Sequence, residues 1–245
     1  MIDLRIFDTK AELGEAAAKL GADAIRKAIR DKGHATIIVA TGASQFEMLG
    51  QLVAEDDIDW SLVTAFHLDE YVGISKDHPA SFRRYLQDRF ADPLQGKALL
   101  HEINAEGDPQ AEADRVGRLI ENETIDVCFA GIGENCHLAF NDPPADFDTT
   151  APYIVVNLDE ACRRQQMGEG WFATLDDVPR QAISMGIRQI MKSALIVGSI
   201  PDLRKAQAVK DALERPVDPA FPASILQHHP NAALFLDRDA ASLLS

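Results

Sequence analysis

The segment FAGIGENCHLAFNDPP, residues 129–144, places a histidine and an aspartate five residues apart, directly after a turn rich in glycine and asparagine. A carboxylate within hydrogen-bond reach fixes the tautomer of an imidazole and stabilises its protonated form, which a proton shuttle requires. His137 and Asp142 are therefore candidates for acid–base chemistry. The alternative for a lone histidine is a satisfied core residue, so the hypothesis depends on other reactive groups lying close by.

A second candidate is the carboxylate pair in LDEY, residues 68–71. Adjacent side chains of an extended segment point to opposite sides, so we expect only one of Asp69 and Glu70 to face a site. A carboxylate held in a partly dry cleft has a raised pKa and can act as a general base. The alternative is a solvated pair at a turn or a helix cap.

Anion binding is indicated by TGAS, which joins a predicted strand to a predicted helix and comprises Thr41, Gly42, Ala43 and Ser44. The free N–H groups at a helix N-terminus suit a phosphate or a carboxylate. The alternative is an ordinary turn with Ser44 as N-cap. Neither GxxxxGK[ST] nor GxGxxG is present. Lys205, on a later predicted helix, is either a solvated charge or a phosphate contact.

Metal ligation is not expected, because no HxxxH or HExxH spacing occurs and His228 and His229 are far from the other candidates in sequence. The three cysteines, Cys128, Cys136 and Cys162, form no CxxC pair, which suits reduced thiols in a cytoplasm.

Apolar runs and amphipathic stretches alternate along the chain, which predicts an α/β fold: a Rossmann-like open, mostly parallel sheet with helices on both faces. We expect one domain spanning 1–245, with residues 142–182 forming loops around a site. The expected strands are 2–7, 35–40, 61–69, 124–133, 193–199 and 231–237. The expected helices are 9–30, which starts with a Thr9–Glu12 capping box, 44–55, 79–90, 110–122 and 202–214.

The candidate residues all follow predicted strands, whereas the opposite strand ends carry nothing comparable. In open α/β sheets, ligands bind beyond the carboxyl ends of the strands. This asymmetry favours an enzyme.

Composition excludes several other classes. The chain has a formal net charge of −15 and no basic run, so nucleic acid is not an expected partner. No run of about 18 uncharged apolar residues is present, so no membrane span is expected. The N-terminal MIDLRIFDTK lacks the pattern of a secretory signal, which favours a cytoplasmic protein.

Three motifs together, FHLDEYVGI, GIGENCHLAFNDPP and RKAQAV, resemble the glucosamine-6-phosphate deaminase (isomerase) family, which is related to 6-phosphogluconolactonase. The resemblance runs from about residue 35 to residue 237, and LDEY and HLAFND favour the deaminase branch. It implies conversion of a 2-amino-2-deoxyhexose 6-phosphate and water to a ketose 6-phosphate and ammonia, without a cofactor.

The resemblance also implies roles for individual residues. Asp69 corresponds to the base that moves a proton between C1 and C2, His137 to the histidine that opens the sugar ring, and Asp142 to the acid that supports it. The catalytic group expected is Asp69, His137, Asp142 and Asn135. The substrate-binding group expected is Thr41, Gly42, Ala43, Ser44, Glu70, Gly133 and Lys205.

The chain departs from the family pattern GxGxDGHIAFNEP at Asn135, Cys136 and Asp142, the last one methylene shorter than the usual glutamate, and it lacks a family arginine further along the chain. Asn135 stands where the family has aspartate; it can hydrogen-bond the imidazole but cannot offset its charge. Cys136 stands where the family has glycine, which is expected to narrow the pocket or change the turn. A phosphate-binding arginine before the VP turn has no counterpart; Glu169 and Gly170 lie there, and Arg163 and Arg164 are the substitutes considered.

Other functions remain open on the same residues. They are galactosamine-6-phosphate isomerisation, hydrolysis of a 6-phosphogluconolactone and non-catalytic sensing of a sugar phosphate. The resemblance also leaves open a homo-oligomer, since the family includes hexamers and monomers.

Overall fold

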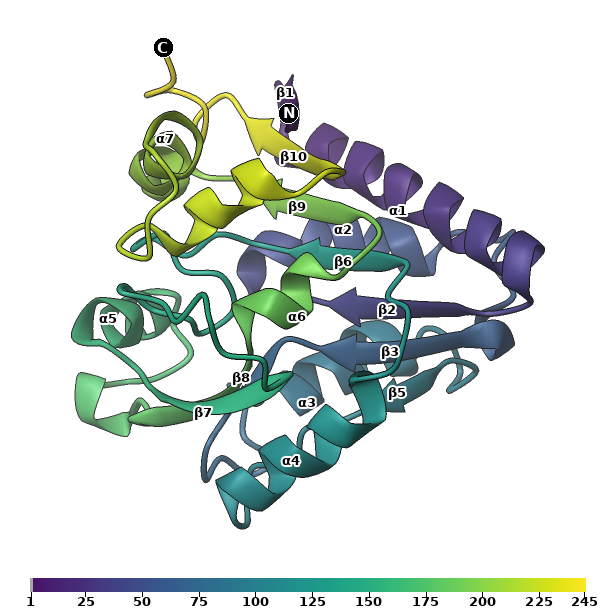
Figure 1. The fold of residues 1–245 in the computed structure, drawn as a ribbon, viewed down its shortest axis with the longest axis horizontal. Helices are drawn as coiled ribbons and strands as arrows, with labels where there is room; N and C mark the ends of the chain where they lie inside the picture. The colour runs from purple at the N-terminus through teal and green to yellow at the C-terminus, as the bar shows by residue number, and fades with distance from the viewer. Residues whose placement is uncertain (1) are drawn as a thin grey trace.

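The structure, a computed structural model, describes residues 2–245. Seven strands form its main sheet: β1 (Asp3–Phe7), β2 (Ala35–Val39), β3 (Val63–His67), β5 (Leu99–His101), β6 (Val127–Ala130), β9 (Ile196–Ile200) and β10 (Ala232–Asp237). They lie in the order β1-β10-β9-β6-β2-β3-β5, and every neighbouring pair is parallel (Figure 1). The short strand β5 was not predicted from the sequence.

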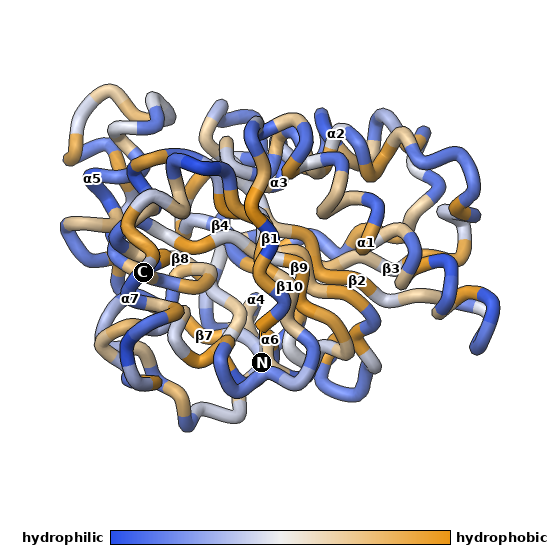
Figure 2. Tube along the Cα trace, turned by 90° about the horizontal axis from the view of Figure 1, so that it is seen from above, coloured by the Kyte–Doolittle hydropathy of each residue, from blue (hydrophilic) through white to orange (hydrophobic). Residues whose placement is uncertain are grey.

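Helices cover both faces of this sheet, as predicted. The first face packs against α1 (Lys10–Lys32), α2 (Phe46–Val53) and α3 (Phe82–Leu86), and the second against α4 (Pro109–Ile120), α6 (Ile187–Met191) and α7 (Ala206–Glu214). Figure 2 shows the apolar strands β2, β9 and β10 inside a largely hydrophilic outer layer. The predicted fold class is therefore confirmed.

Local sequence explains these elements. Thr9 and Glu12 form the predicted capping box at the start of α1, which satisfies backbone donors that the first turn leaves free. All five residues of β2 are buried. Ile37 and Val39 face one helical layer and Ile38 faces the other, because successive strand side chains alternate.

A second, antiparallel sheet stands beside the first. It consists of β4 (Asp69–Tyr71), β8 (Gln181–Met185) and β7 (Tyr153–Asn157), in that order. The prediction of one strand over 61–69 was therefore wrong in part. The chain leaves the main sheet after His67 and pairs with residues more than a hundred positions away, which apolar patterning does not show.

The prediction of loops over 142–182 was also wrong in part. This segment contains β7, the first residues of β8 and the helix α5 (Glu160–Gly168). The residues that α5 buries are Cys162, Arg163, Gln165 and Gln166. Because the inward face is mostly polar, the segment lacks the apolar stripe by which an amphipathic helix is recognised.

Candidate active site

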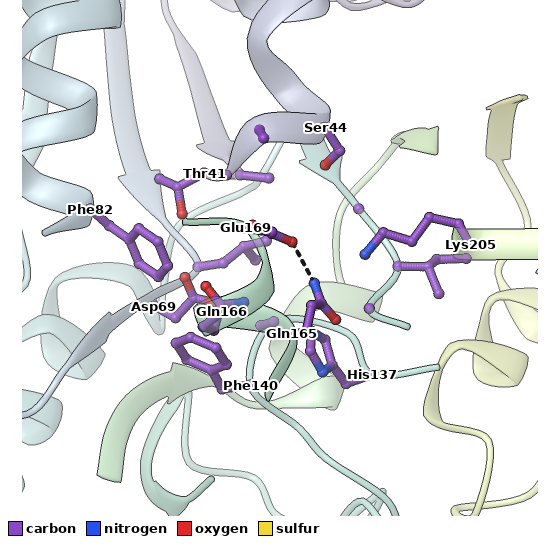
Figure 3. Close-up of a pocket in the computed structure, with 18 residues that line it drawn as sticks. Thr41, Ser44, Asp69, Phe82, His137, Phe140, Gln165, Gln166, Glu169 and Lys205 are labelled. Carbon is purple, nitrogen blue, oxygen red and sulfur yellow. Dashed lines mark hydrogen bonds between the residues drawn. The ribbon is translucent and has the colours of Figure 1, made fainter. Parts of the chain in front are cut away.

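A pocket opens where the strand order reverses. From β2 the chain runs outward through β3 to β5, and it returns to β6 on the other side of β2. Loops after β2 and β6 meet there with β4 and α5 (Figure 3). Among the residues predicted for the site, those lining this pocket are Thr41, Gly42, Ala43, Ser44, Asp69, Gly133, His137 and Lys205. The location agrees with the rule for open α/β sheets.

One end of the pocket suits an anion. Gly42 has φ +102°, a conformation that L side chains rarely adopt, and it leads into a 3-10 turn, Ala43–Gln45. Ser44 does not cap α2; its hydroxyl accepts a hydrogen bond from Gln45 Nε2 at 3.0 Å. Lys205 is 5% exposed and directs its ammonium into the pocket (Figure 3). Burial lowers the pKa of Lys205, and the carboxylate of Glu169 opposes this shift.

The other end holds Asp69, which is 6% exposed. Burial, followed by the nearby charge of Glu70, raises the pKa of Asp69 to about 8, whereas a hydrogen bond with Thr41 acts in the opposite direction. Once ionised, such a carboxylate is a much stronger base than an exposed aspartate. A cationic ligand beside it would favour the ionised form.

Glu70 lies outside the pocket, contrary to its prediction as a substrate-binding residue. Alternation along β4 turns its side chain away from Asp69, into the start of α3. The Glu70 carboxylate accepts hydrogen bonds from the N–H groups of Tyr71, Phe82 and Arg83 at 3.0, 3.2 and 2.9 Å, and from the Ser81 hydroxyl at 2.8 Å. Its role in the structure is to anchor α3 against β4.

This anchor supplies a stability prediction. Glu70→Leu should lower the free energy of unfolding by about 3–5 kcal/mol, because it leaves several buried donors without their acceptor and removes the carboxylate that lies 3.5 Å from Arg83 Nε. Urea unfolding followed by circular dichroism would measure the change. Ser81→Ala, which removes one of these donors, should cost only about 1 kcal/mol. A loss below about 1 kcal/mol for Glu70→Leu would contradict the proposed anchor.

The imidazole of His137 is fixed by Asp142 and by close packing against Gly133. Its Nδ1 lies 3.0 Å from Asp142 Oδ1, and Nε2 lies against Gly133, where a Cβ atom would sit only 2.2 Å from it. Any larger residue at 133 would therefore displace the ring. Burial by itself would raise the pKa of Asp142, but hydrogen bonds from His137, Asn135 and the Asp159 backbone hold that pKa below its usual value.

The side chain of Asn135 forms hydrogen bonds with two carboxylates and with the backbone of His137, and not with its ring. Its Nδ2 donates to Asp142 Oδ1 at 3.0 Å and to Asp159 Oδ2 at 3.2 Å, and its Oδ1 accepts from the His137 backbone N–H at 3.3 Å. An aspartate at this position would add a third carboxylate beside two others. The amide is therefore the better partner for this pair of acids.

Cys136 lies outside the pocket, so the expectation that it narrows the pocket is wrong. It has φ +70° and is 2% exposed, and its thiol contacts the carbonyl of Ala208 on α7. The side chain thus fills the interface between the turn and α7.

The metal question concerns one group of side chains. A ring nitrogen of His137, an Asp142 oxygen and Cys162 Sγ lie within 4.8 Å of one another. Burial and the neighbouring carboxylates raise the pKa of the Cys162 thiol, which therefore stays protonated. Because a metal ligand must be the thiolate, this group is poorly suited to hold an ion.

Sequence reasoning missed the wall that α5 and neighbouring aromatic residues build. The added lining residues that bear on chemistry are Phe82, Phe140, Gln165, Gln166 and Glu169. The Glu169 carboxylate accepts hydrogen bonds from Gln165 Nε2 at 2.8 Å and Trp171 Nε1 at 3.3 Å. One feature of the sequence pointed to this wall: Glu169 stands at the place where the family has a phosphate-binding arginine.

Neither arginine considered as a phosphate ligand lines the pocket. Arg163 is buried and donates to the carbonyls of Val178 and Leu175, whereas Arg164 pairs with Glu160 on the exposed side of α5. Arg204 and Lys10 line an adjoining pocket that shares Ser44, Glu169 and Lys205 with the first. Of the residues in 2–245 that line the first pocket, only Lys205 carries a fixed positive charge.

These features define a class: an α/β enzyme with a pocket that suits an anion at one end and holds groups able to exchange protons at the other. A family model for glucosamine-6-phosphate isomerases/6-phosphogluconolactonase matches residues 8–235. The chain belongs to this family.

Individual relatives agree with the assignment. The chain is 39% identical over 217 residues to a glucosamine-6-phosphate deaminase of Exiguobacterium sibiricum, covering 89% of this chain and 84% of the relative. It is 35% identical over 242 residues to one of Lactobacillus delbrueckii subsp. bulgaricus, covering 98% of both. A solved monomeric glucosamine-6-phosphate deaminase superposes with a TM-score of 0.89 at 32% identity, covering 99% of this chain and 100% of that one.

A 6-phosphogluconolactonase from Shewanella baltica has a TM-score of 0.81 at 21% identity, covering 97% of this chain and 98% of that one. At this identity the similarity demonstrates a shared fold.

Proposed function

We propose that this protein converts glucosamine 6-phosphate and water to fructose 6-phosphate and ammonia. One observation carries the proposal: Asp69 and His137, from different strand ends, face the same pocket as Lys205. The deaminase names of the relatives support it.

The phosphate binds at the end formed by Thr41–Ser44 and Lys205. Backbone N–H groups and one ammonium recognise its oxygens. Glu169 stands near this end, so the site is less positive than one lined by lysine and arginine. The apolar rings of Phe82 and Phe140, 5.9 Å apart, enclose the opposite side of the pocket.

His137 opens the ring. Its Nε2 takes the proton of the C1 hydroxyl and delivers a proton to O5 as the C1–O5 bond breaks, which yields the open-chain aldehyde. Asp142 accepts a hydrogen bond from the Nδ1–H of His137 and so fixes the tautomer of the ring. Its charge stabilises the imidazolium while the ring carries the extra proton. Asn135 positions Asp142 and does not touch the substrate.

Asp69 then moves the proton from C2 to C1 of the open-chain sugar, while one proton of the C2 ammonium passes to the C1 oxygen. The products are a hydroxyl at C1 and a protonated imine at C2. Addition of water at C2 releases ammonia and leaves the ketone. The substrate ammonium lies beside Asp69 in the bound state, and its charge favours the ionised carboxylate that the step needs.

The remaining expectations follow from this assignment. We propose one domain over 1–245 acting in the cytoplasm, where the three free buried cysteines stay reduced. Among residues 2–245, no helix is long and apolar enough to cross a bilayer. A phosphosugar is the proposed partner, and the monomeric relative makes a monomer the first state to test for this chain.

Ammonia release from glucosamine 6-phosphate tests the function. We expect wild-type protein to release ammonia and fructose 6-phosphate in equal amounts, with a higher kcat/KM than for galactosamine 6-phosphate. Faster release from galactosamine 6-phosphate would reassign the epimer. Hydrolysis of 6-phosphogluconolactone without ammonia release from either amino sugar would favour the lactonase reaction, and binding without turnover would favour a sensor.

A further inference from the structure

Gln166 on α5 presents a buried hydrogen-bond donor to the pocket. The side chain is 6% exposed and lines the pocket wall. Its Oε1 accepts a hydrogen bond from the Tyr71 hydroxyl at 2.6 Å. Its Nε2 makes no hydrogen bond with any other residue among 2–245, yet it is not sealed in the core. A buried amide N–H that opens only to a pocket is satisfied by what binds there.

Tyr71 determines which way the amide of Gln166 faces. Its ring is enclosed by Phe82, Phe140 and Phe172, with centroids 5.0, 5.2 and 5.5 Å away. Burial raises the pKa of Tyr71 well above its ordinary value, so the hydroxyl keeps its proton. Within this apolar enclosure its acceptor is the amide oxygen of Gln166, which turns the amide nitrogen toward the pocket.

The donor and the base are positioned by the same strand. Along β4, Asp69 faces the pocket, Glu70 points the other way and Tyr71 returns to the first side, beneath α5. Figure 3 shows Gln166 on the same side of the pocket as Asp69, across from Lys205. Gln166 and Asp69 therefore face the same end of the pocket.

We propose that Gln166 is a catalytic residue that donates a hydrogen bond to the oxygen on C1 of the open-chain substrate, and that Tyr71 is the positioning residue that aims it. This inference rests on the proposed function. When Asp69 takes the C2 proton, the C–H electron pair forms the C1–C2 double bond and the carbonyl pair moves onto the C1 oxygen. The amide N–H stabilises that developing negative charge and keeps its own proton, and the oxygen takes its proton from the C2 ammonium of the substrate.

Three variants separate this role from a purely structural one. Gln166→Leu should lower kcat by about 10²–10³-fold with a small change in KM, because the lost bond strengthens in the transition state. Tyr71→Phe should lower kcat by about tenfold, since the amide remains but is free to turn. Tyr153→Phe is the matched control; it removes another buried tyrosine hydroxyl, bonded to the His67 carbonyl at 2.7 Å, and should leave kcat within about twofold.

A binding measurement identifies the oxygen. Calorimetry would compare 2-amino-2-deoxyglucitol 6-phosphate with its 1-deoxy analogue, two unreactive ligands that differ only in the C1 oxygen. We expect wild-type protein to prefer the first by about tenfold and Gln166→Leu to bind both equally.

Equal binding of the two ligands by wild-type protein, or an undiminished preference in Gln166→Leu, would overturn the inference. A wild type that shows the preference but releases no ammonia would refute the proposed reaction and retain the contact. Failure of wild-type protein to bind either ligand would refute both.

Discussion

Asp69→Asn is expected to reduce ammonia release from glucosamine 6-phosphate by at least about 10³-fold, because an amide cannot carry the proton from C2 to C1. The KM should change little, since the phosphate end of the pocket is untouched. Steady-state kinetics with coupled ammonia detection would measure both constants. The matched control is Glu70→Gln, the neighbouring carboxylate that lies outside the pocket. A residual rate above about a tenth of wild type would contradict Asp69 as the base.

The same residue predicts the pH dependence of the wild type. Only the ionised carboxylate acts as a base, and burial raises the pKa of Asp69 to about 8 in the empty pocket. The kcat/KM for the substrate should therefore rise with pH and level off above the pKa of about 8. The pKa that governs kcat should be lower than the one that governs kcat/KM, because the ammonium of the bound substrate favours ionisation of Asp69. A kcat/KM that stays constant between about pH 6 and about pH 9 would contradict the assignment.

Asp69→Asn should also stabilise the protein at alkaline pH. A carboxyl group whose folded pKa is raised to about 8 from 3.8 binds its proton more tightly when folded, so the free energy of unfolding falls as pH rises between these values. The asparagine variant lacks this pH-dependent loss. Above pH 8 its free energy of unfolding should exceed that of wild type by a few kcal/mol, with about 1.4 kcal/mol per pKa unit as an upper bound. Urea unfolding at acidic and alkaline pH would test the sign, since the difference should shrink in acid.

His137→Gln is expected to lower kcat by about 10²–10⁴-fold, because ring opening loses its proton shuttle while the phosphate site stays intact. Gln also lacks the ring that fills the space beside Gly133. Asp142→Asn should have a smaller effect, about 10–10²-fold, because the imidazole remains, whereas an amide can present its donor as well as its acceptor to Nδ1 and carries no charge to stabilise the imidazolium.

Substrate supplied in the open-chain form separates the two steps. If His137 acts in ring opening, His137→Gln should turn over the small open-chain fraction of the sugar, in a pre-steady-state burst whose size matches that fraction. Proton exchange at C2 would persist in this variant and disappear in Asp69→Asn. Equal loss of C2 exchange in both variants would place His137 in the C2 step instead.

Local sequence patterns were enough to predict the sheet class, the strand ends that carry the chemistry and most of the pocket's reactive groups. These features are local: a buried strand is recognised from a short apolar run, and a turn delivers the residues that follow it in the chain. Asp69, His137, Asp142 and the Thr41–Ser44 turn were found in this way, and the structure places Asp69, His137 and the turn at one pocket with Asp142 behind the imidazole.

The residues that complete this pocket, and the contacts of each carboxylate, depend on how distant elements pack together. The second sheet pairs β4 with β8, which assigned Asp69 to the pocket and Glu70 to the anchor of α3. Gln166 is 95 positions from Tyr71, the residue that orients it. A polar helix such as α5 lacks the apolar stripe by which a helix is recognised in a sequence. Hydrogen bonds between residues so distant in the chain depend on how whole elements pack, which no short stretch of sequence encodes.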